Sequence, residues 1–335
     1  MAAWLLGVRL LKLIYMTSPH LTSDLPTVLM PISSDFVAAR HAALCAKAPQ
    51  LRVVTDLADC DVSHIDALFT FKLSPGIAPR LPNLKLAASV GAGADGLLAA
   101  GDIPAHVAVT RVVERGLGLS MAQYVAYQVL RRFRNFDVFE AQAREHRWVR
   151  APIPDSRAHT VGLMGVGEIG SVVAEALTAL GFKVIGWTRS GRAVASVARV
   201  FAGDKELSAF LGMSDTLVCL LPFTNDTKGL LNSETLQQLK PGAYLVNAAR
   251  GGIVNELDLL ALIQSGHLSG AALDVFANEP LPLGDPLWSH PQIAVTPHVA
   301  AQPSVAAAVD QFIENLNRVR SGQTPLHTVD RLIGY

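Results

Sequence analysis

Short apolar runs alternate along the chain with longer segments in which apolar residues recur every three or four positions. The short runs predict strands and the longer segments predict helices. In the first third of the chain we expect strands at residues 27–30, 52–55, 67–69, 85–89 and 107–110, and a helix at 36–48. Strands that alternate with helices are typical of a parallel α/β sheet.

A second series of the same kind begins at residue 160. Strands are expected at residues 160–164, 183–187, 216–220, 243–247, 270–273 and 293–296. Six strands with helices between them fit a complete doubly wound dinucleotide domain. The predicted fold class is therefore α/β, with two doubly wound parallel-sheet lobes and a cleft between them. The second lobe is expected to be Rossmann-type and the first flavodoxin-like.

Two further helices are predicted outside this alternation. Residues 120–146 have helical spacing, and their many Arg, Gln and aromatic residues indicate packing on something outside their own lobe. Residues 304–320 form a helix after the second lobe is already complete, so we expect this helix to return to the first lobe.

Composition excludes several classes of function. The 335 residues carry 28 Lys+Arg and 28 Asp+Glu, so no net field favours nucleic acid or an anionic membrane surface. The three cysteines are far apart and form no metal or disulfide pattern, which indicates a reducing, cytoplasmic compartment. The ten histidines fall in no ligand spacing, so no metal site is predicted.

The N-terminal segment is apolar but does not predict a membrane anchor. Arg9 and Lys12 interrupt it, so it is too short to span a bilayer. Its cations follow the apolar run instead of preceding it, which does not fit a signal peptide. We expect residues 1–25 to be an unstructured extension, or a product of an upstream start with Met16 as the true first residue.

A glycine-rich loop follows the strand at residues 160–164. Gly165, Gly167 and Gly170 form G-x-G-x-x-G between this strand and an amphipathic helical pattern. The glycines allow a tight turn, close approach of a pyrophosphate and close helix packing. A chance glycine turn is the alternative, but the flanking strand and helix favour dinucleotide binding. Glu168 and Ile169, within the motif, are expected to contact the cofactor.

The next strand indicates which dinucleotide is bound. NAD enzymes place a carboxylate at its end to bind the ribose 2′-hydroxyl. Here the strand ends at Trp187, Arg189, Ser190 and Arg192 follow, and no acidic residue occurs between positions 175 and 204. Two guanidinium groups suit a 2′-phosphate, although a solvated basic turn is the alternative. We predict NADPH, with NADH as a weaker alternative.

Three charged residues follow predicted strands of the second lobe. Arg250 lies after small residues, Ala248 and Ala249, that leave room for a cofactor ring. Glu279 and His298 follow the last two strands. Carboxyl ends of parallel strands meet at one edge of a sheet, so these three side chains are expected to lie together.

A cation, a carboxylate and an imidazole at one edge match the needs of 2-oxo acid reduction. Arg250 can bind the substrate carboxylate with a fork of donors, and His298 can donate a proton. Glu279 would orient and charge that imidazole. Each residue alone could equally be a surface ion pair, a packing residue or the start of a turn.

The order and spacing of four segments resemble those of the D-isomer-specific 2-hydroxyacid dehydrogenases. These segments span residues 165–170, 247–251, 274–280 and 296–298. Residues 90–95, 286–291 and the ending 329–335 most resemble the glyoxylate/hydroxypyruvate reductase A type. The resemblance covers the chain from about residue 26 to its end.

The resemblance implies a domain organisation and an assembly. The substrate lobe would be discontinuous, formed by residues 26–115 and 302–335, and the NADP-binding lobe would span 116–301. Family members are usually dimers held by the cofactor lobe, so a homodimer with the helix at 120–146 in its interface is expected. Arg250, Glu279 and His298 match the catalytic trio of the family.

The resemblance also implies further binding residues. Additional cofactor contacts are expected from Leu221, Pro222, Thr227, Arg250, Asp274, His298 and Ala300. Substrate contacts are expected from Phe71, Lys72, Val90, Gly91, Ala92 and Trp288, besides Arg250 and His298. The backbone N–H groups of Val90 and Gly91 would hold the substrate carboxylate, and Trp288 would reach the neighbouring subunit's site. Phe71 and Lys72 stand where close relatives often carry Trp and a basic or polar residue.

The implied activity is NADPH-dependent reduction of glyoxylate to glycolate and of hydroxypyruvate to D-glycerate, with His298 as proton donor. Reduction of bulkier 2-oxo acids is one alternative, because no motif fixes the group beyond the 2-carbon. A non-catalytic NAD(P)-sensing protein, similar to corepressors that use this fold, is another alternative.

Overall fold

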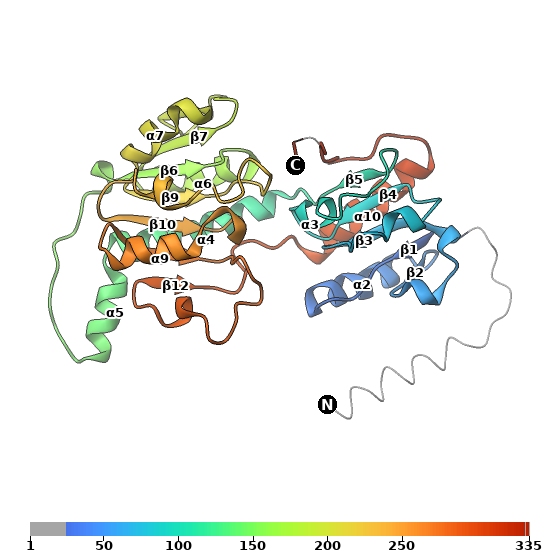
Figure 1. The fold of residues 1–335 in the computed structure, drawn as a ribbon, viewed down its shortest axis with the longest axis horizontal. Coiled ribbons are helices and arrows are strands. Elements are labelled where there is room, and N and C mark those ends of the chain that lie inside the picture. The colour runs from blue at the N-terminus through green and yellow to red at the C-terminus, as the bar shows by residue number, and fades with distance from the viewer. Residues whose placement is uncertain (1–24, 332, 335) are drawn as a thin grey trace.

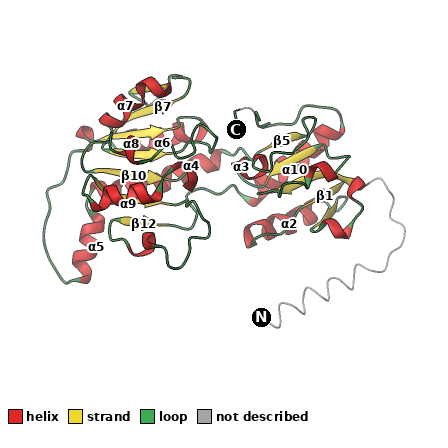
Figure 2. Ribbon diagram, in the orientation of Figure 1, coloured by secondary structure: helices red, strands yellow, loops and turns green. Residues whose placement is uncertain are grey.

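A computed structural model describes residues 25–331, 333 and 334, and all but the last residue of the expected extension 1–25 lies outside this range. Two parallel sheets form two lobes, and helices flank each sheet (Figures 1 and 2). The prediction of an α/β fold with two parallel-sheet lobes is confirmed. No helix in the described part of the chain is long and apolar enough to cross a membrane.

The first lobe contains five parallel strands in the order β2-β1-β3-β4-β5, the order found in flavodoxin-like sheets. Its elements are β1 (Thr27–Leu29), α2 (Asp35–Lys47), β2 (Arg52–Val54), β3 (Ile65–Thr70), β4 (Leu86–Ser89), α3 (Asp95–Leu98) and β5 (Ala108–Thr110). The last helix, α10 (Val305–Arg320), packs against α2 and β4 of this lobe. The stacked rings of Phe69 and Phe312, with centroids 4.4 Å apart, join β3 to α10.

The second lobe contains seven parallel strands in the order β12-β11-β10-β9-β6-β7-β8. The strands are β6 (Thr160–Met164), β7 (Lys183–Thr188), β8 (Arg199–Ala202), β9 (Thr216–Cys219), β10 (Ala243–Asn247), β11 (Leu268–Leu273) and β12 (Ile293–Val295). The helices between these strands are α6 (Glu168–Ala179), α7 (Gly203–Met213), α8 (Ser233–Leu236) and α9 (Glu256–Gln264). The edge strand β8 was not predicted, because only one of its four residues is fully buried and its apolar pattern is weak.

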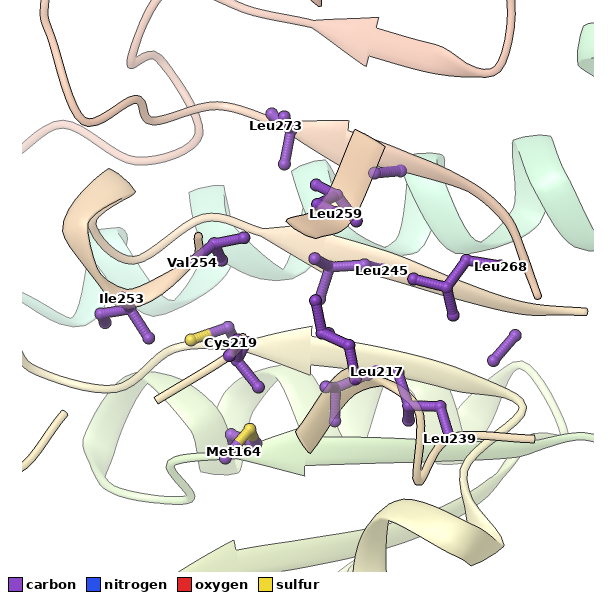
Figure 3. Close-up of a cluster of buried hydrophobic side chains, with 14 of the residues drawn as sticks. Met164, Leu217, Cys219, Leu239, Leu245, Ile253, Val254, Leu259, Leu268 and Leu273 are labelled. Carbon is purple, nitrogen blue, oxygen red and sulfur yellow. The ribbon is translucent and has the colours of Figure 1, made fainter. Parts of the chain in front are cut away.

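Helices on both faces explain why the strands of the second sheet are almost continuously apolar. Val161 and Leu163 of β6 point to the face covered by α6 and by α4 (Arg115–Phe133). Met164 of β6, Leu217 of β9 and Leu245 of β10 lie on the opposite face (Figure 3). The buried side chains on both faces hold the strands in place. They therefore also position the loops that follow the carboxyl ends of the strands.

The prediction of a single helix over residues 120–146 is wrong. The structure has α4 and then a separate helix, α5 (Phe136–Arg144). Asn135 between them adopts a left-handed conformation with φ +56°, which ends the first helix. α4 packs closely on α6, where Gly118 lies against Val172. No residue of α5 is buried.

The chain passes between the lobes before α4 and again before α10 (Figure 1). The two passages are bonded to each other, because the Glu114 carboxylate accepts from the Ser304 backbone N–H at 2.9 Å and from its hydroxyl at 3.0 Å. The buried Arg40 of α2 donates to the Pro303 carbonyl at 2.6 Å. These contacts fasten the crossing segments to the first lobe.

Candidate active site

The loop between β6 and α6 has the geometry of a phosphate-binding turn. Gly165 has φ +99°, and a Cβ on Gly170 would lie 2.1 Å from the Gly165 carbonyl oxygen, so both positions require glycine. Gly167 is the N-cap of α6 and provides no side-chain hydrogen bond. The first N–H groups of α6 can therefore donate to an external phosphate. Glu168 is exposed at this turn and Ile169 is half-buried.

The end of β7 lies beside this loop. The carbonyl of Trp187 accepts from the Gly165 N–H at 3.0 Å. The Trp187 side chain itself is packed in the core and its indole N–H donates to a backbone carbonyl of the same lobe. Arg189, Ser190 and Arg192 follow on the exposed turn. The basic turn and the glycine loop are thus brought to the same edge of the sheet, with Trp187 contributing backbone there.

The segment after β9 lies against the glycine loop. The carbonyl oxygen of Leu220 is only 3.0 Å from where a Cβ on the first glycine would be. Leu221 and Thr227 are buried. The Thr227 hydroxyl donates to the Pro222 carbonyl at 2.7 Å and accepts from the Thr224 N–H at 2.8 Å. In this structure the Thr227 hydroxyl shapes the turn that borders the glycine loop.

Arg250 follows β10 and reaches across to the first lobe. The Asn247 side chain holds its backbone by accepting from the Ala249 N–H and donating to the Arg250 carbonyl, both at 3.2 Å. Ala248 and Ala249 are buried beside it. The Arg250 guanidinium makes a forked ion pair with Asp95, with Nη2–Oδ1 at 3.0 Å. Asp95 was not predicted as a site residue.

His298 and Glu279 form the second charged group. Nδ1 of His298 lies 2.7 Å from Oε2 of Glu279, and Oε1 of Glu279 accepts from the Phe276 N–H at 2.9 Å. Burial raises the pKa of Glu279, but the hydrogen bonds from His298 and Phe276 outweigh it, so the pKa lies below its usual value. Because Nδ1 is held by a carboxylate, Nε2 is the ring nitrogen that can face a substrate.

Asp274 fixes the backbone that carries His298. Its carboxylate accepts from the Thr296 hydroxyl at 2.7 Å and from the N–H groups of Val299 and Ala300, both at 2.9 Å. The Asp274 carbonyl accepts from the His298 N–H at 2.8 Å. Asp274 is 1% exposed. Its carboxylate contacts are thus within the loop after β12, and the structure places Ala300 there as well.

The predicted anion loop follows β4 in the first lobe. The Val90 N–H points to the Thr70 carbonyl at 3.4 Å, and the Gly91 N–H donates to the Ser89 hydroxyl at 3.1 Å. Both N–H groups therefore have partners within the lobe in this structure. Ala92 lines a hollow of about 270 Å³ at the junction of the lobes.

Residues from the two predicted binding sets border that same hollow. Ile169 and Glu168 of the glycine loop line it together with Ala92 of the first lobe. Phe71 packs against Gly91, because its Cζ lies 2.8 Å from where a Cβ on that glycine would be. The glycine loop after β6 and the loop after β4 therefore meet at the junction of the two lobes.

The remaining predicted substrate residues are on the surface. Lys72 is exposed. Trp288 is in the short helix η6 (Pro286–Ser289), is 48% exposed, and its indole N–H donates to the Pro282 carbonyl at 2.9 Å. Neither side chain lines the hollow at the junction.

A glycine loop, a basic turn and two charged groups at the carboxyl edge of one doubly wound sheet are typical of dinucleotide-dependent dehydrogenases. Residues 126–300 match the model of the D-isomer specific 2-hydroxyacid dehydrogenase NAD binding domain. The chain belongs to this family.

Curated relatives and solved structures agree with this assignment. A glyoxylate/hydroxypyruvate reductase A from Citrobacter koseri is 44% identical over 259 residues, which cover 75% of this chain and 82% of the relative. The NADPH-dependent glyoxylate/hydroxypyruvate reductase of Sinorhizobium meliloti, solved with NADP and sulfate, is 37% identical with a TM-score of 0.84. A dehydrogenase from Xanthobacter autotrophicus, solved with NADPH and MES, has the same identity and TM-score. Each alignment with a solved structure covers 92% of this chain and 99% of the other.

Proposed function

We propose that this protein reduces small 2-oxo acids with NADPH, converting glyoxylate to glycolate and hydroxypyruvate to D-glycerate. The observation that carries the proposal is the placement of Arg250 and of the His298–Glu279 pair at the same sheet edge as the glycine loop. The names of the relatives from Citrobacter koseri and Sinorhizobium meliloti give the reaction and the substrates.

The residues of this chain have complementary tasks in that reaction. A bound nicotinamide dinucleotide supplies the hydride to the carbonyl carbon. Arg250 binds the substrate carboxylate and polarises the carbonyl oxygen. Nε2 of His298 gives its proton to that oxygen, so the carbonyl becomes a hydroxyl. Glu279, hydrogen-bonded to Nδ1, orients the ring so that Nε2 is the nitrogen that can face the carbonyl oxygen.

The substrate end of the pocket is assigned to the first lobe. We place the substrate beside the loop at Val90, Gly91 and Ala92, with Phe71 as a wall and Lys72 as a nearby cation. The Gly91 N–H would exchange its bond with the Ser89 hydroxyl for one with the substrate carboxylate.

A substrate panel tests the reaction. We would follow NADPH oxidation with glyoxylate, hydroxypyruvate, pyruvate and phenylpyruvate. Fastest turnover of glyoxylate and hydroxypyruvate is expected. Turnover of phenylpyruvate alone would keep the chemistry but contradict the proposed preference for small acids, and would favour the bulkier 2-oxo acids.

The residues that we assign to the cofactor fit a dinucleotide with a 2′-phosphate. The uncapped first turn of α6 would donate to a pyrophosphate, and the turn after β7 presents Arg189, Ser190 and Arg192 in place of a carboxylate. Arg189 and Arg192 would form charge-assisted hydrogen bonds to the phosphate. We therefore assign the preference for NADPH over NADH to this turn.

Exchanging this turn should reverse the preference. Arg189→Asp with Arg192→Ser removes two cations and supplies the carboxylate that binds a ribose 2′-hydroxyl. Two charge-assisted hydrogen bonds, each of about 1.5–3 kcal/mol, predict a fall of at least about a hundredfold in the NADPH to NADH ratio of kcat/KM. Steady-state kinetics with both cofactors measures this ratio.

Arg157→Ser is the matched control, because Arg157 is an exposed arginine of the same lobe that pairs with Asp155, two residues before it. The control should leave the cofactor ratio unchanged. An unchanged ratio in the double variant would place 2′-phosphate recognition elsewhere.

We further propose a homodimer formed by the α4–α5 region. Trp148 is 90% exposed and Ile153 is 76% exposed, in the segment that follows α5. This segment extends away from the sheet of its lobe (Figure 1). Large apolar side chains on an exposed segment are typical of a subunit interface. In a symmetric dimer, a second copy of the chain would cover this segment, which we call the arm, and would have its own arm covered in turn. We assign the exposed Trp288 to contact with the partner's substrate site.

Charges on the arm should separate the subunits. Trp148→Glu with Ile153→Glu buries unpaired carboxylates in the proposed interface, so light scattering after gel filtration should show half the wild-type mass. Leu257→Glu, which alters an exposed leucine of α9, is the control and should remain dimeric. A wild-type protein with the mass of a single chain would contradict the proposal.

We also propose boundaries for the two lobes and a compartment for the protein. We assign residues 26–115 with 302–335 to the substrate lobe and 116–301 to the cofactor lobe, in keeping with the packing of α10 on α2 and of α4 on α6. All three cysteines are free, which suits the reducing cytoplasm.

A further inference from the structure

The carboxylate that pairs with Arg250 belongs to Asp95, in the opposite lobe. Asp95 follows β4 of the first sheet, whereas Arg250 follows β10 of the second. Oδ1 of Asp95 lies 3.2 Å from Nε of Arg250 and 3.0 Å from Nη2, and Oδ2 lies 3.1 Å from Nε. About a quarter of each side chain is exposed, so water does not fully screen the pair. The Asp95 carboxylate therefore binds the edge of the guanidinium that is formed by Nε and Nη2.

The Arg250 guanidinium has more donors than Asp95 takes up. A guanidinium has one hydrogen on Nε and two on each terminal nitrogen. Asp95 takes the Nε hydrogen and one from Nη2, and the Ala249 carbonyl takes one from Nη1 at 2.7 Å. Within residues 25–331, 333 and 334, no further acceptor takes the second hydrogen on Nη1 or on Nη2. Two donors on neighbouring nitrogens are what a forked contact to a substrate carboxylate needs.

Gly93 allows the guanidinium to reach this position. A Cβ at residue 93 would lie 2.0 Å from Nη2 of Arg250 and 2.6 Å from Oδ1 of Asp95. Any side chain there would push the guanidinium out of place. The loop at residues 93–95 thus provides both the space for Arg250 and the carboxylate that orients it.

We propose that Asp95 is a positioning residue for substrate binding, which fixes the Arg250 guanidinium across the lobe junction with its terminal nitrogens directed to the 2-oxo acid. This inference rests on the proposed function, in which Arg250 binds the substrate carboxylate. The substrate clamp is therefore assembled from both lobes, and its geometry depends on their contact.

Binding of oxamate, an unreactive isostere of a 2-oxo acid, to the NADPH-loaded protein tests the proposal without requiring turnover. Asp95→Asn keeps the size of the side chain but removes its charge. We expect oxamate affinity to fall about tenfold to a hundredfold, because a misdirected fork loses the geometry of the contact. Gly93→Ala should produce a similar loss with both charges kept. NADPH affinity should change little in either variant.

A double-mutant cycle separates positioning from a general loss of structure. In an Arg250→Lys background no fork remains to be oriented, so adding Asp95→Asn should weaken oxamate by less than about threefold. Additive losses in the two variants would overturn the proposal. So would tighter oxamate binding by Asp95→Asn, since that would make Asp95 a repelling charge.

Asp66→Asn is the matched control. Asp66 is in β3 of the same lobe, where it accepts from the Thr27 N–H at the opposite edge of the sheet. Its replacement should leave oxamate binding unchanged. A wild-type protein that binds oxamate but never reduces glyoxylate would contradict the proposed function, while the binding cycle would still decide the role of Asp95.

Discussion

Replacing His298 by alanine is expected to lower kcat for glyoxylate by about 10²- to 10⁴-fold, the usual contribution of a positioned general acid. The hydride would still arrive at the carbonyl carbon, but the developing alkoxide would have no proton donor. Cofactor affinity should change little, because the backbone of this loop is held by Asp274 independently of the imidazole. Stopped-flow turnover and a fluorescence titration with NADPH measure the two quantities.

A second variant removes an ambiguity in that experiment. His298 has φ +55°, a conformation that costs alanine about 1–2 kcal/mol and that asparagine tolerates better. His298→Asn should therefore retain the loop and still lose turnover. His106→Ala, at an exposed histidine of the first lobe, should behave as wild type. Loss of NADPH affinity with normal turnover in both His298 variants would refute the proton-donor role.

Arg250→Lys is expected to lower kcat/KM by about 10²- to 10³-fold, which is the loss seen when one donor to a developing oxyanion is removed. Lysine keeps the positive charge but is a point charge without the planar fork, so it cannot hold a carboxylate and polarise the carbonyl together. Its shorter reach would also weaken the pair with Asp95. The measurement is kcat and KM for glyoxylate at saturating NADPH.

The charge-conserving control for this variant is Arg157→Lys, at the surface pair with Asp155. It should leave both kinetic constants unchanged. If Arg250→Lys retained wild-type kcat/KM, the assignment of Arg250 to the substrate carboxylate would be wrong. A similar loss in thermal stability for both variants would show that the surface pair and the site pair contribute alike to folding.

The site could be predicted where its residues follow from one parallel sheet. Gly165, Arg250 and His298 each come directly after a strand of the second lobe, so the alternation of strands and helices already assigns them to one edge. The glycine motif was specific because an apolar strand precedes it and an amphipathic helix follows it. For these residues the sequence pattern alone predicted that they lie at one edge of the sheet, as they do in the structure.

What could not be predicted depends on contacts between distant segments. The Asp95 pair with Arg250 joins two lobes, and no periodicity within either lobe specifies how they meet. The one hint in the sequence was that an acidic residue, Asp95, directly follows the small residues at 91–94. Asn135 ended a helix that the apolar spacing would have continued, because a single left-handed residue leaves that spacing intact.

The ratio of NADPH consumed to glycolate formed tests the proposed reductase activity most directly. Wild-type protein would be given NADPH and glyoxylate, and the NADPH consumed would be compared with the glycolate formed. We predict catalytic turnover with one glycolate produced for each NADPH oxidised. Tight NADPH binding without oxidation, under the same conditions and with hydroxypyruvate as well, would contradict a reductase and would favour the NAD(P)-sensing alternative.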